Sequence, residues 1–230
     1  MNGKLIGIGV GPGDPELMTF KALKAIKECD VLAVPDADKG TSTAYRIVEG
    51  LWPEVESKEY FTLVMPMTHD MAKLRENYRR AADKVEEYLN SGRTVGFITL
   101  GDPSVYSTYM YVHKLILEDG FEAEIISGVT SFCAAAARLN ISLAERTEML
   151  HVVPSSHGIE KALDMPGTKV LMKAGSKMAL VKEKLLNSEM NVMMVENCGM
   201  DTEQKYFSAE EIPDQASYYS LIIVKEKRKK

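Results

Sequence analysis

The chain has 230 residues, of which 45% are hydrophobic and 27% charged, and its formal net charge is -5 at pH 7. This length and composition fit a globular protein with one large domain or two small ones. The acidic balance argues against a nucleic-acid partner, because such proteins usually carry a basic face. No apolar stretch approaches the roughly 20 residues that a membrane span needs.

The cysteines and the N-terminal sequence predict a cytoplasmic protein. Cys29, Cys133 and Cys198 are odd in number and far apart, which fits a reducing compartment better than a disulfide framework. The N-terminus has no long apolar run before a small-residue cleavage site, so we expect no signal peptide. The histidines lack metal-ligand spacing, so we expect no metal site.

The first half of the chain alternates apolar runs with helical periodicity. Strands are predicted at 4–10, 30–34 and 93–99, and helices at 19–28, 41–51, 70–91 and 107–119. Gly92 and Gly120 follow two of these helices, at the position where glycine commonly ends a helix. The order predicts a mainly parallel sheet with helices packed on it.

A second set of elements follows. Strands are predicted at 122–126, 151–153, 168–172, 191–196 and 218–224, with helices at 131–139 and 178–188. We place a domain junction near residues 118–121, which gives an N-terminal α/β domain, 1–118, and a C-terminal α/β domain, 119–230. Because the linker is short, we expect the two α/β domains to meet in a ligand cleft.

Two Gly-Asp-Pro turns each follow a predicted strand, at 13–15 and at 101–103. Open α/β sheets bind small ligands at the carboxyl ends of their strands. The first turn ends the run Gly-x-Gly-x-Gly at 9–13, which differs from the dinucleotide fingerprint Gly-x-Gly-x-x-Gly. Pro12 and Pro15 also remove two backbone donors that a phosphate cradle would use.

Local chemistry leaves the role of each loop open. The first loop either brings a ligand close to backbone or is a tight turn capped by Asp14 or Thr19. Asp102 either accepts hydrogen bonds from a ribose or cationic ligand, or forms an Asx turn. Thr130 and Ser131 either present hydroxyls to a ligand or cap the helix that follows.

These motifs, in this order, resemble the tetrapyrrole methylase family over essentially the whole chain. The residues that carry the resemblance are Gly-x-Gly-x-Gly-Asp-Pro at 9–15, Leu-Gly-Asp-Pro-Ser-x-Tyr-Ser-Thr at 100–108, Gly-Val-Thr-Ser-Phe at 128–132 and Val-Glu-Asn-Cys-Gly-Met at 195–200. The resemblance implies a homodimer of two-domain subunits that uses S-adenosylmethionine as methyl donor and releases S-adenosylhomocysteine.

The resemblance also implies a substrate and a reaction. The Met-Pro-Met-Thr segment at 65–68 resembles the branch that methylates C20 of precorrin-2, or of its cobalt form, in cobalamin biosynthesis. The substrate is therefore expected to be a tetrapyrrole. The sequence leaves the metal-free and cobalt-bearing forms equally open. The remaining alternatives are another tetrapyrrole methylase, an NAD(P)-linked dehydrogenase, and a non-catalytic ligand-binding module.

By position, the resemblance implies a donor site and a substrate site in one cleft. The implied donor contacts are Pro35, Leu100, Gly101, Asp102, Val105, Tyr106, Thr130, Ser131, Met172, Lys173, Asn197, Cys198, Tyr219 and Leu221. The implied tetrapyrrole contacts are Gly11, Pro12, Gly13 and Asp14.

The chain departs from the family at two of these positions. Val105 stands where relatives often have an aromatic residue, and Lys173 follows Met172 where some relatives have glycine. The resemblance assigns no catalytic base, and we expect Asp102 to matter more than Asp14 for donor binding. Lys39, Arg46, Arg75 and Arg138 are the cations available for the substrate carboxylates.

Overall fold

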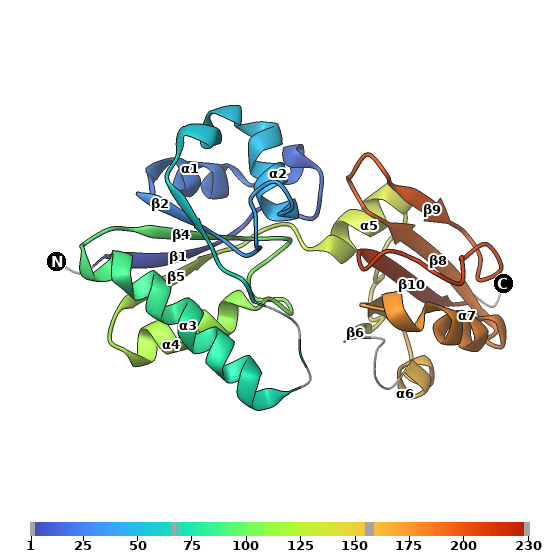
Figure 1. Ribbon diagram of the computed structural model, residues 1–230. Helices are drawn as coiled ribbons and strands as arrows, with labels where there is room; N and C mark the ends of the chain where they lie inside the picture. Colours follow the sequence, from blue (N-terminus) through green and yellow to red (C-terminus); the bar gives the residue numbers. More distant parts are fainter. Residues whose placement is uncertain (1–2, 66–67, 69, 155–158, 228–230) are drawn as a thin grey trace. The chain divides into compact units, whose positions relative to one another are not determined.

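The computed structural model describes residues 3–65, 68, 70–154 and 159–227. It consists of two compact units, Met1–Thr130 and Ser131–Lys230 (Figure 1). Each unit has a five-stranded sheet with helices packed on it, which confirms the predicted two α/β domains. Within the 65–70 segment, Pro66, Met67 and His69 lie outside the described residues, as does His157.

The first unit has a parallel sheet with the strand order β3-β2-β4-β1-β5. Its strands are β1 (Lys4–Gly9), β2 (Val31–Val34), β3 (Tyr60–Thr62), β4 (Val95–Thr99) and β5 (Glu122–Ile126). Strands β2 and β4 are buried along their whole length, as expected for a sheet covered on both faces.

Four helices form the outer layers of the first unit. Helices α1 (Phe20–Glu28) and α2 (Thr43–Leu51) cover one face of the sheet, and α3 (Met71–Asn90) and α4 (Tyr109–Glu118) cover the other (Figure 1). Short 3-10 helices lie at Pro15–Leu17 and Pro53–Ser57. Thr19 and Ser42 cap α1 and α2 with their hydroxyl oxygens, as their side-chain chemistry favours.

The predicted domain boundary is wrong, because the strand at 122–126 belongs to the first sheet. Strand β5 pairs in parallel with β1, from Lys4 opposite Glu122 to Ile8 opposite Ile126. The first unit therefore extends to Thr130 instead of ending at Glu118. A glycine turn at 120 ends α4, but the chain continues into the same sheet and not into a linker.

The second unit has a mixed sheet with the order β6-β7-β10-β8-β9. Its strands are β6 (Leu150–Pro154), β7 (Thr168–Met172), β8 (Met190–Glu196), β9 (Gln204–Tyr206) and β10 (Ser220–Glu226). Only β6 and β7 pair in parallel, and the other neighbouring pairs are antiparallel. The sheet is thus built differently from that of the first unit.

The helices of the second unit pack on both faces of this sheet. Helices α6 (Ile159–Leu163) and α7 (Met178–Leu186) close a core with Leu171 and Ile222, while α5 (Ser131–Leu139) packs on β8 and β10 on the other face (Figure 1). A 3-10 turn at Gly175–Lys177 precedes α7.

Candidate functional site

The glycine-rich loops of the first unit follow β1 and β4, which are neighbours in the sheet. After these two strands the chain crosses to opposite sides of the sheet order. From β1 it crosses to β2, and from β4 it crosses past β1 to β5. Helices α1 and α4, which follow β1 and β4, accordingly lie on opposite faces of the sheet. In open α/β sheets such a reversal opens a crevice at the carboxyl ends of the two strands, where ligands bind.

Backbone hydrogen bonds close this crevice. The Val10 amide donates to the Thr99 carbonyl at 3.0 Å, and Gly11 and Gly101 exchange two amide-to-carbonyl bonds, at 3.3 and 2.7 Å. Gly11, Pro12 and Gly13 are themselves buried. A dinucleotide pyrophosphate would need open amides at this place, so the pairing of the two glycine turns argues against a dehydrogenase.

A third loop packs against the paired turns without room for a side chain. A Cβ atom on Gly128 would lie 2.0 Å from the carbonyl oxygen of Gly101, and one on Gly9 would lie 2.6 Å from the Gly128 amide nitrogen. Glycine is therefore required at both positions for the backbones to approach. The loops after β1, β4 and β5 form one close-packed backbone cluster.

The Asp102 carboxylate joins two of these loops. Its Oδ1 accepts from the Ser104 amide at 2.8 Å and from the Ser104 hydroxyl at 2.5 Å, and its Oδ2 accepts from the Gly128 amide at 3.0 Å. The side chain is buried, with 7% exposure. The Asx turn anticipated from the sequence is present, and the bond to Gly128 is an addition that the sequence did not indicate.

The other first-unit residues implied by the resemblance lie around these loops. Pro35 is half-buried and directly follows β2, while Leu100, Val105, Thr130 and Ser131 are also half-buried. Tyr106 has a left-handed backbone, with a φ of 51°, and its side chain is 48% exposed. Asp14 caps the 3-10 turn at 15–17 by accepting from the Glu16 amide at 3.0 Å.

The second-unit residues implied by the resemblance gather at one end of the second sheet. Met172, at the end of β7, is opposite Leu221 of β10. The Asn197 amide, just beyond β8, donates to the Tyr219 carbonyl at 3.1 Å. Lys173 and Asn197 both have left-handed backbones, with φ of 60° and 51°. Residues that are far apart in sequence thus form one edge, and such backbone outliers are typical of ligand sites.

Burial controls the ionisation of this edge. Desolvation lowers the pKa of the half-buried Lys173 ammonium. The Cys198 thiol is buried, which raises its pKa to about 11, so the sulfur stays protonated at neutral pH. Cys198 is therefore not a nucleophile at this pH.

Glu196, at the end of β8 beside Asn197, was not predicted from the sequence, although it lies inside the Val-Glu-Asn-Cys-Gly-Met motif. Its two carboxylate oxygens accept from the Ser217 amide at 2.5 Å and from the Tyr206 hydroxyl at 3.2 Å. It thereby ties β8 and β9 to the segment that leads into Tyr219. The signal was its place next to Asn197 within a quoted motif.

The four candidate cations for substrate carboxylates differ in their surroundings. The Lys39 ammonium lies 5.3 Å and 5.1 Å from the ring centroids of Tyr45 and Tyr60. The Arg138 Nε is 3.2 Å from a Glu203 carboxylate oxygen. Arg46 and Arg75 are exposed, near the starts of α2 and α3.

The described residues contain neither a cluster of metal ligands nor a helix that could span a membrane. No group of three histidine, cysteine, aspartate or glutamate side chains in this part of the chain is placed to hold a metal ion. Within the same residues, no helix is long and apolar enough to cross a membrane.

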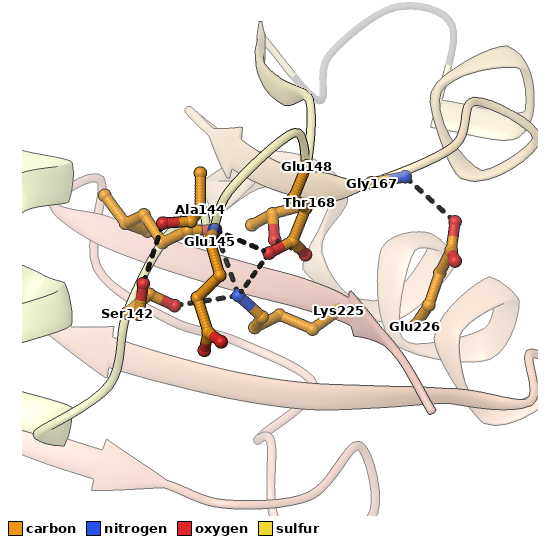
Figure 2. Close-up of polar contacts among 9 residues, drawn as sticks. Ser142, Ala144, Glu145, Glu148, Gly167, Thr168, Lys225 and Glu226 are labelled. Atoms are coloured by element: carbon orange, nitrogen blue, oxygen red, sulfur yellow. Dashed lines mark hydrogen bonds and ion pairs between the residues drawn. The ribbon is translucent and has the colours of Figure 1, made fainter. Parts of the chain in front are cut away.

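A separate pocket of about 570 Å³ lies at the other end of the second sheet, lined by residues 145–149, 166–167 and 225–227. Figure 2 shows the carboxylate of Glu148, one of the lining residues, which accepts from the Thr168 hydroxyl at 2.7 Å and from the Glu145 amide at 3.1 Å. The Lys225 ammonium lies 3.3 Å from Glu148 and donates to two backbone carbonyls of the 142–143 segment. The Glu148 and Lys225 side chains in the lining therefore bind each other and the neighbouring backbone.

We expect Glu148→Gln to reduce stability at neutral pH by about 1–2 kcal/mol, since a charge-assisted hydrogen bond is lost. The hydrogen bond from the Thr168 hydroxyl lowers the pKa of Glu148 the most, and the hydrogen bonds from Glu145 and Lys225 lower it further. This stabilisation is therefore present above the unfolded-state pKa, about 4.3, and is lost as pH falls through the lower folded-state pKa.

Thermal unfolding of wild type and Glu148→Gln from pH 7 to pH 3 checks this prediction. The difference in melting temperature between wild type and Glu148→Gln should become smaller as the pH falls. Glu183→Gln, at an exposed position of α7, is the matched control and should leave the melting temperature unchanged. A gap that stays constant down to pH 3 would contradict the assigned role of the carboxylate.

The two α/β units, with glycine-rich loops and left-handed residues at their strand ends, define a class of small-molecule-binding α/β proteins. Within this class, the chain belongs to the family of tetrapyrrole (corrin/porphyrin) methylases, whose model matches residues 4–213. The resemblance to this family, from which the expected site residues were taken, is thereby confirmed.

Two curated relatives match most of this chain. A probable cobalt-precorrin-2 C(20)-methyltransferase from Methanocaldococcus jannaschii is 39% identical over 185 residues, which cover 79% of this chain and 78% of that protein. A precorrin-2 C(20)-methyltransferase from a Sinorhizobium species is 31% identical over 233 residues, covering 96% and 95%.

A solved structure shares the fold. It is the uroporphyrin-III C-methyltransferase of Thermus thermophilus complexed with S-adenosylhomocysteine, with a TM-score of 0.69, 21% identity, and coverage of 97% of this chain and 98% of that one.

Proposed function

We propose that this chain is an S-adenosylmethionine-dependent methyltransferase that methylates C20 of precorrin-2 or of its cobalt form in cobalamin biosynthesis. The observation that carries the proposal is the similarity, over most of each chain, to two C20-methyltransferases of this pathway. The family assignment supports the tetrapyrrole as substrate class. The glycine-rich loops at the carboxyl ends of β1 and β4 support a small-molecule site in the first unit.

The proposed donor contacts suit S-adenosylmethionine chemically. Thr130 and Ser131 offer hydroxyls for a ribose. Leu100, Val105 and Met172 offer apolar surface for the adenine. The remaining proposed contacts are Pro35, Gly101, Asp102, Tyr106, Lys173, Asn197, Cys198, Tyr219 and Leu221. When bound, the sulfonium group supplies an already activated methyl.

The chain's own residues then act mainly by alignment and exclusion of water. The reduced tetrapyrrole has an electron-rich meso carbon, so in-line transfer needs correct placement more than a strong base. Placement can contribute roughly 7–11 kcal/mol in favourable cases. The close approach of Gly9, Gly101 and Gly128 restricts the movement of these loops, and apolar side chains beside them disfavour water.

For the substrate side, we propose that Gly11, Pro12, Gly13 and Asp14 lie against the tetrapyrrole. Its carboxylates need exposed cations. Lys39 lies over two tyrosine rings and Arg138 pairs with Glu203. We therefore propose Arg46 and Arg75, which are exposed near the starts of helices that follow the carboxyl edge of the first sheet.

Isothermal titration calorimetry with S-adenosylhomocysteine and with NAD tests the donor assignment. We expect the sulfur ligand to bind with a micromolar or lower dissociation constant and NAD to give no heat of binding. The closed crevice between β1 and β4 is the structural reason for the second expectation. Binding of NAD alone would favour a dehydrogenase and overturn the proposal.

We also propose a cytoplasmic homodimer. All three cysteines are free thiols, which supports a reducing compartment. The homodimer rests on the family resemblance. Sedimentation equilibrium of the purified chain would report twice the 25.6 kDa subunit mass if the proposal holds, and the subunit mass alone if it does not.

A further inference from the structure

We infer that Asp102 is a positioning residue, whose carboxylate is turned into the first unit to hold two donor-site loops together. This inference rests on the proposed function, because it assigns a role within the same site. The sequence left two roles open for this carboxylate, hydrogen bonds to a ligand or an Asx turn. The contacts of its two oxygens point to the protein interior.

The first argument is burial together with saturation by protein donors. Asp102 is 7% exposed, and its carboxylate accepts three hydrogen bonds from within the first unit. A buried carboxylate is stable only when such donors replace its lost hydration. The oxygens are therefore committed to the Ser104 and Gly128 groups and do not face a ligand.

The second argument is where those bonds lead. Gly128 is two residues before Thr130, so the Oδ2 bond fixes the start of the segment that carries the proposed ribose contacts. The two Oδ1 bonds, with the Val105 amide that donates to the Asp102 carbonyl at 3.2 Å, fix the turn that leads to Tyr106. One side chain thus sets the geometry of both proposed contact segments.

The third argument is the number of acceptors that the position needs. Both carboxylate oxygens receive N–H donors, Oδ1 from Ser104 and Oδ2 from Gly128. An asparagine side chain has the same shape but only one oxygen, so its NH₂ group would face one of these N–H groups, donor against donor. Asp102→Asn therefore breaks one link while it keeps the volume of the side chain.

Asp30 provides the matched control within the same sheet. Its Oδ2 accepts from the Thr94 amide at 2.7 Å. This bond links the residues before β2 and β4, at the ends of the strands away from Asp102. One acceptor oxygen carries this carboxylate-to-backbone link, so asparagine can keep it. Asp30→Asn should bind S-adenosylhomocysteine as wild type does.

The experiment compares wild type, Asp102→Asn and Asp30→Asn by titration with S-adenosylhomocysteine and by steady-state kinetics. We expect Asp102→Asn to weaken binding about tenfold or more and to raise KM for the methyl donor by a similar factor. KM for the tetrapyrrole should stay within about twofold. A general loss of structure would change both KM values, so this split separates positioning from folding. Wild-type affinity in Asp102→Asn would overturn the inference.

Ser104→Ala covers the case in which Asp102→Asn does not fold. It removes the hydroxyl bond to Oδ1 but leaves both backbone N–H bonds in place. We expect about a threefold weaker affinity, and unchanged affinity would count against the inference. If wild type itself fails to bind S-adenosylhomocysteine, the proposed function fails first, so the two failures are distinguishable.

Discussion

Gly128→Ala is expected to lower the free energy of unfolding by about 3 kcal/mol, at the upper end of what overpacking usually costs, and to remove binding of S-adenosylhomocysteine. The added Cβ would lie 2.0 Å from the Gly101 carbonyl oxygen and 2.9 Å from two Gly9 backbone atoms. Backbone atoms that pair with their neighbours cannot move aside as a flexible side chain could. The three loops must separate, and the proposed donor contacts separate with them.

Thermal unfolding and calorimetric titration measure the two effects. Gly101→Ala is the matched control, because nothing lies within 4 Å of its added Cβ and only its backbone φ of 69° opposes the change. The cost there should be about 1–2 kcal/mol. If Gly101→Ala destabilised the protein more than Gly128→Ala, the close contact of the loops would be wrong.

Gly7→Ala is expected to destabilise the first unit by about 3 kcal/mol, through overpacking against a buried ring. The added Cβ would lie 2.2 Å from two ring atoms of Tyr109. This ring is fully buried, and its hydroxyl lies 2.9 Å from both the Glu124 carbonyl and the His113 ring. Burial raises the pKa of Tyr109, so the hydroxyl stays protonated and the ring stays anchored.

A double-mutant cycle with Tyr109→Leu checks the cause. The ring is absent in Tyr109→Leu. Adding Gly7→Ala to that variant should therefore lower its free energy of unfolding by less than about 1 kcal/mol. Thermal unfolding of the four proteins gives the coupling. Equal costs in both backgrounds would mean that the clash with the ring is not the reason for glycine at this position.

The predictable part of the fold was the part with long apolar periodicity. Helix α3 was expected at 70–91 and is found at Met71–Asn90, and β7 has the predicted bounds. The elements that were missed, namely β3, α6 and β9, have three, five and three residues, too few to show a period. The antiparallel pairing of the second sheet depends on contacts that no local pattern contains.

The domain boundary failed for a related physical reason. Strand β5 alternates between more and less exposed residues and forms the edge of the first sheet, next to β1. Its partner is more than a hundred residues away in the sequence, so the nearby glycine at 120 gave a misleading local signal. Strand pairing, unlike strand formation, is set by long-range packing.

The positions of the strand-end loops were predictable from the sequence, but the orientation of their side chains was not. Loops at strand ends follow from the alternation of strands and helices, so the regions around Gly101, Thr130 and Asn197 could be anticipated. The inward turn of Asp102 could not, because its partner Gly128 is 26 residues away. The same holds for Glu196, whose partner Ser217 lies 21 residues further along the chain.

Methyl transfer to anaerobically prepared precorrin-2, with and without cobalt, tests the central claim most directly. With S-adenosylmethionine as donor, we predict a product that is heavier by one methyl group and carries it on C20, together with stoichiometric S-adenosylhomocysteine. The faster of the two reactions would identify the natural form of the substrate. Methylation at another carbon, or no transfer by a protein that binds the donor, would contradict the proposal.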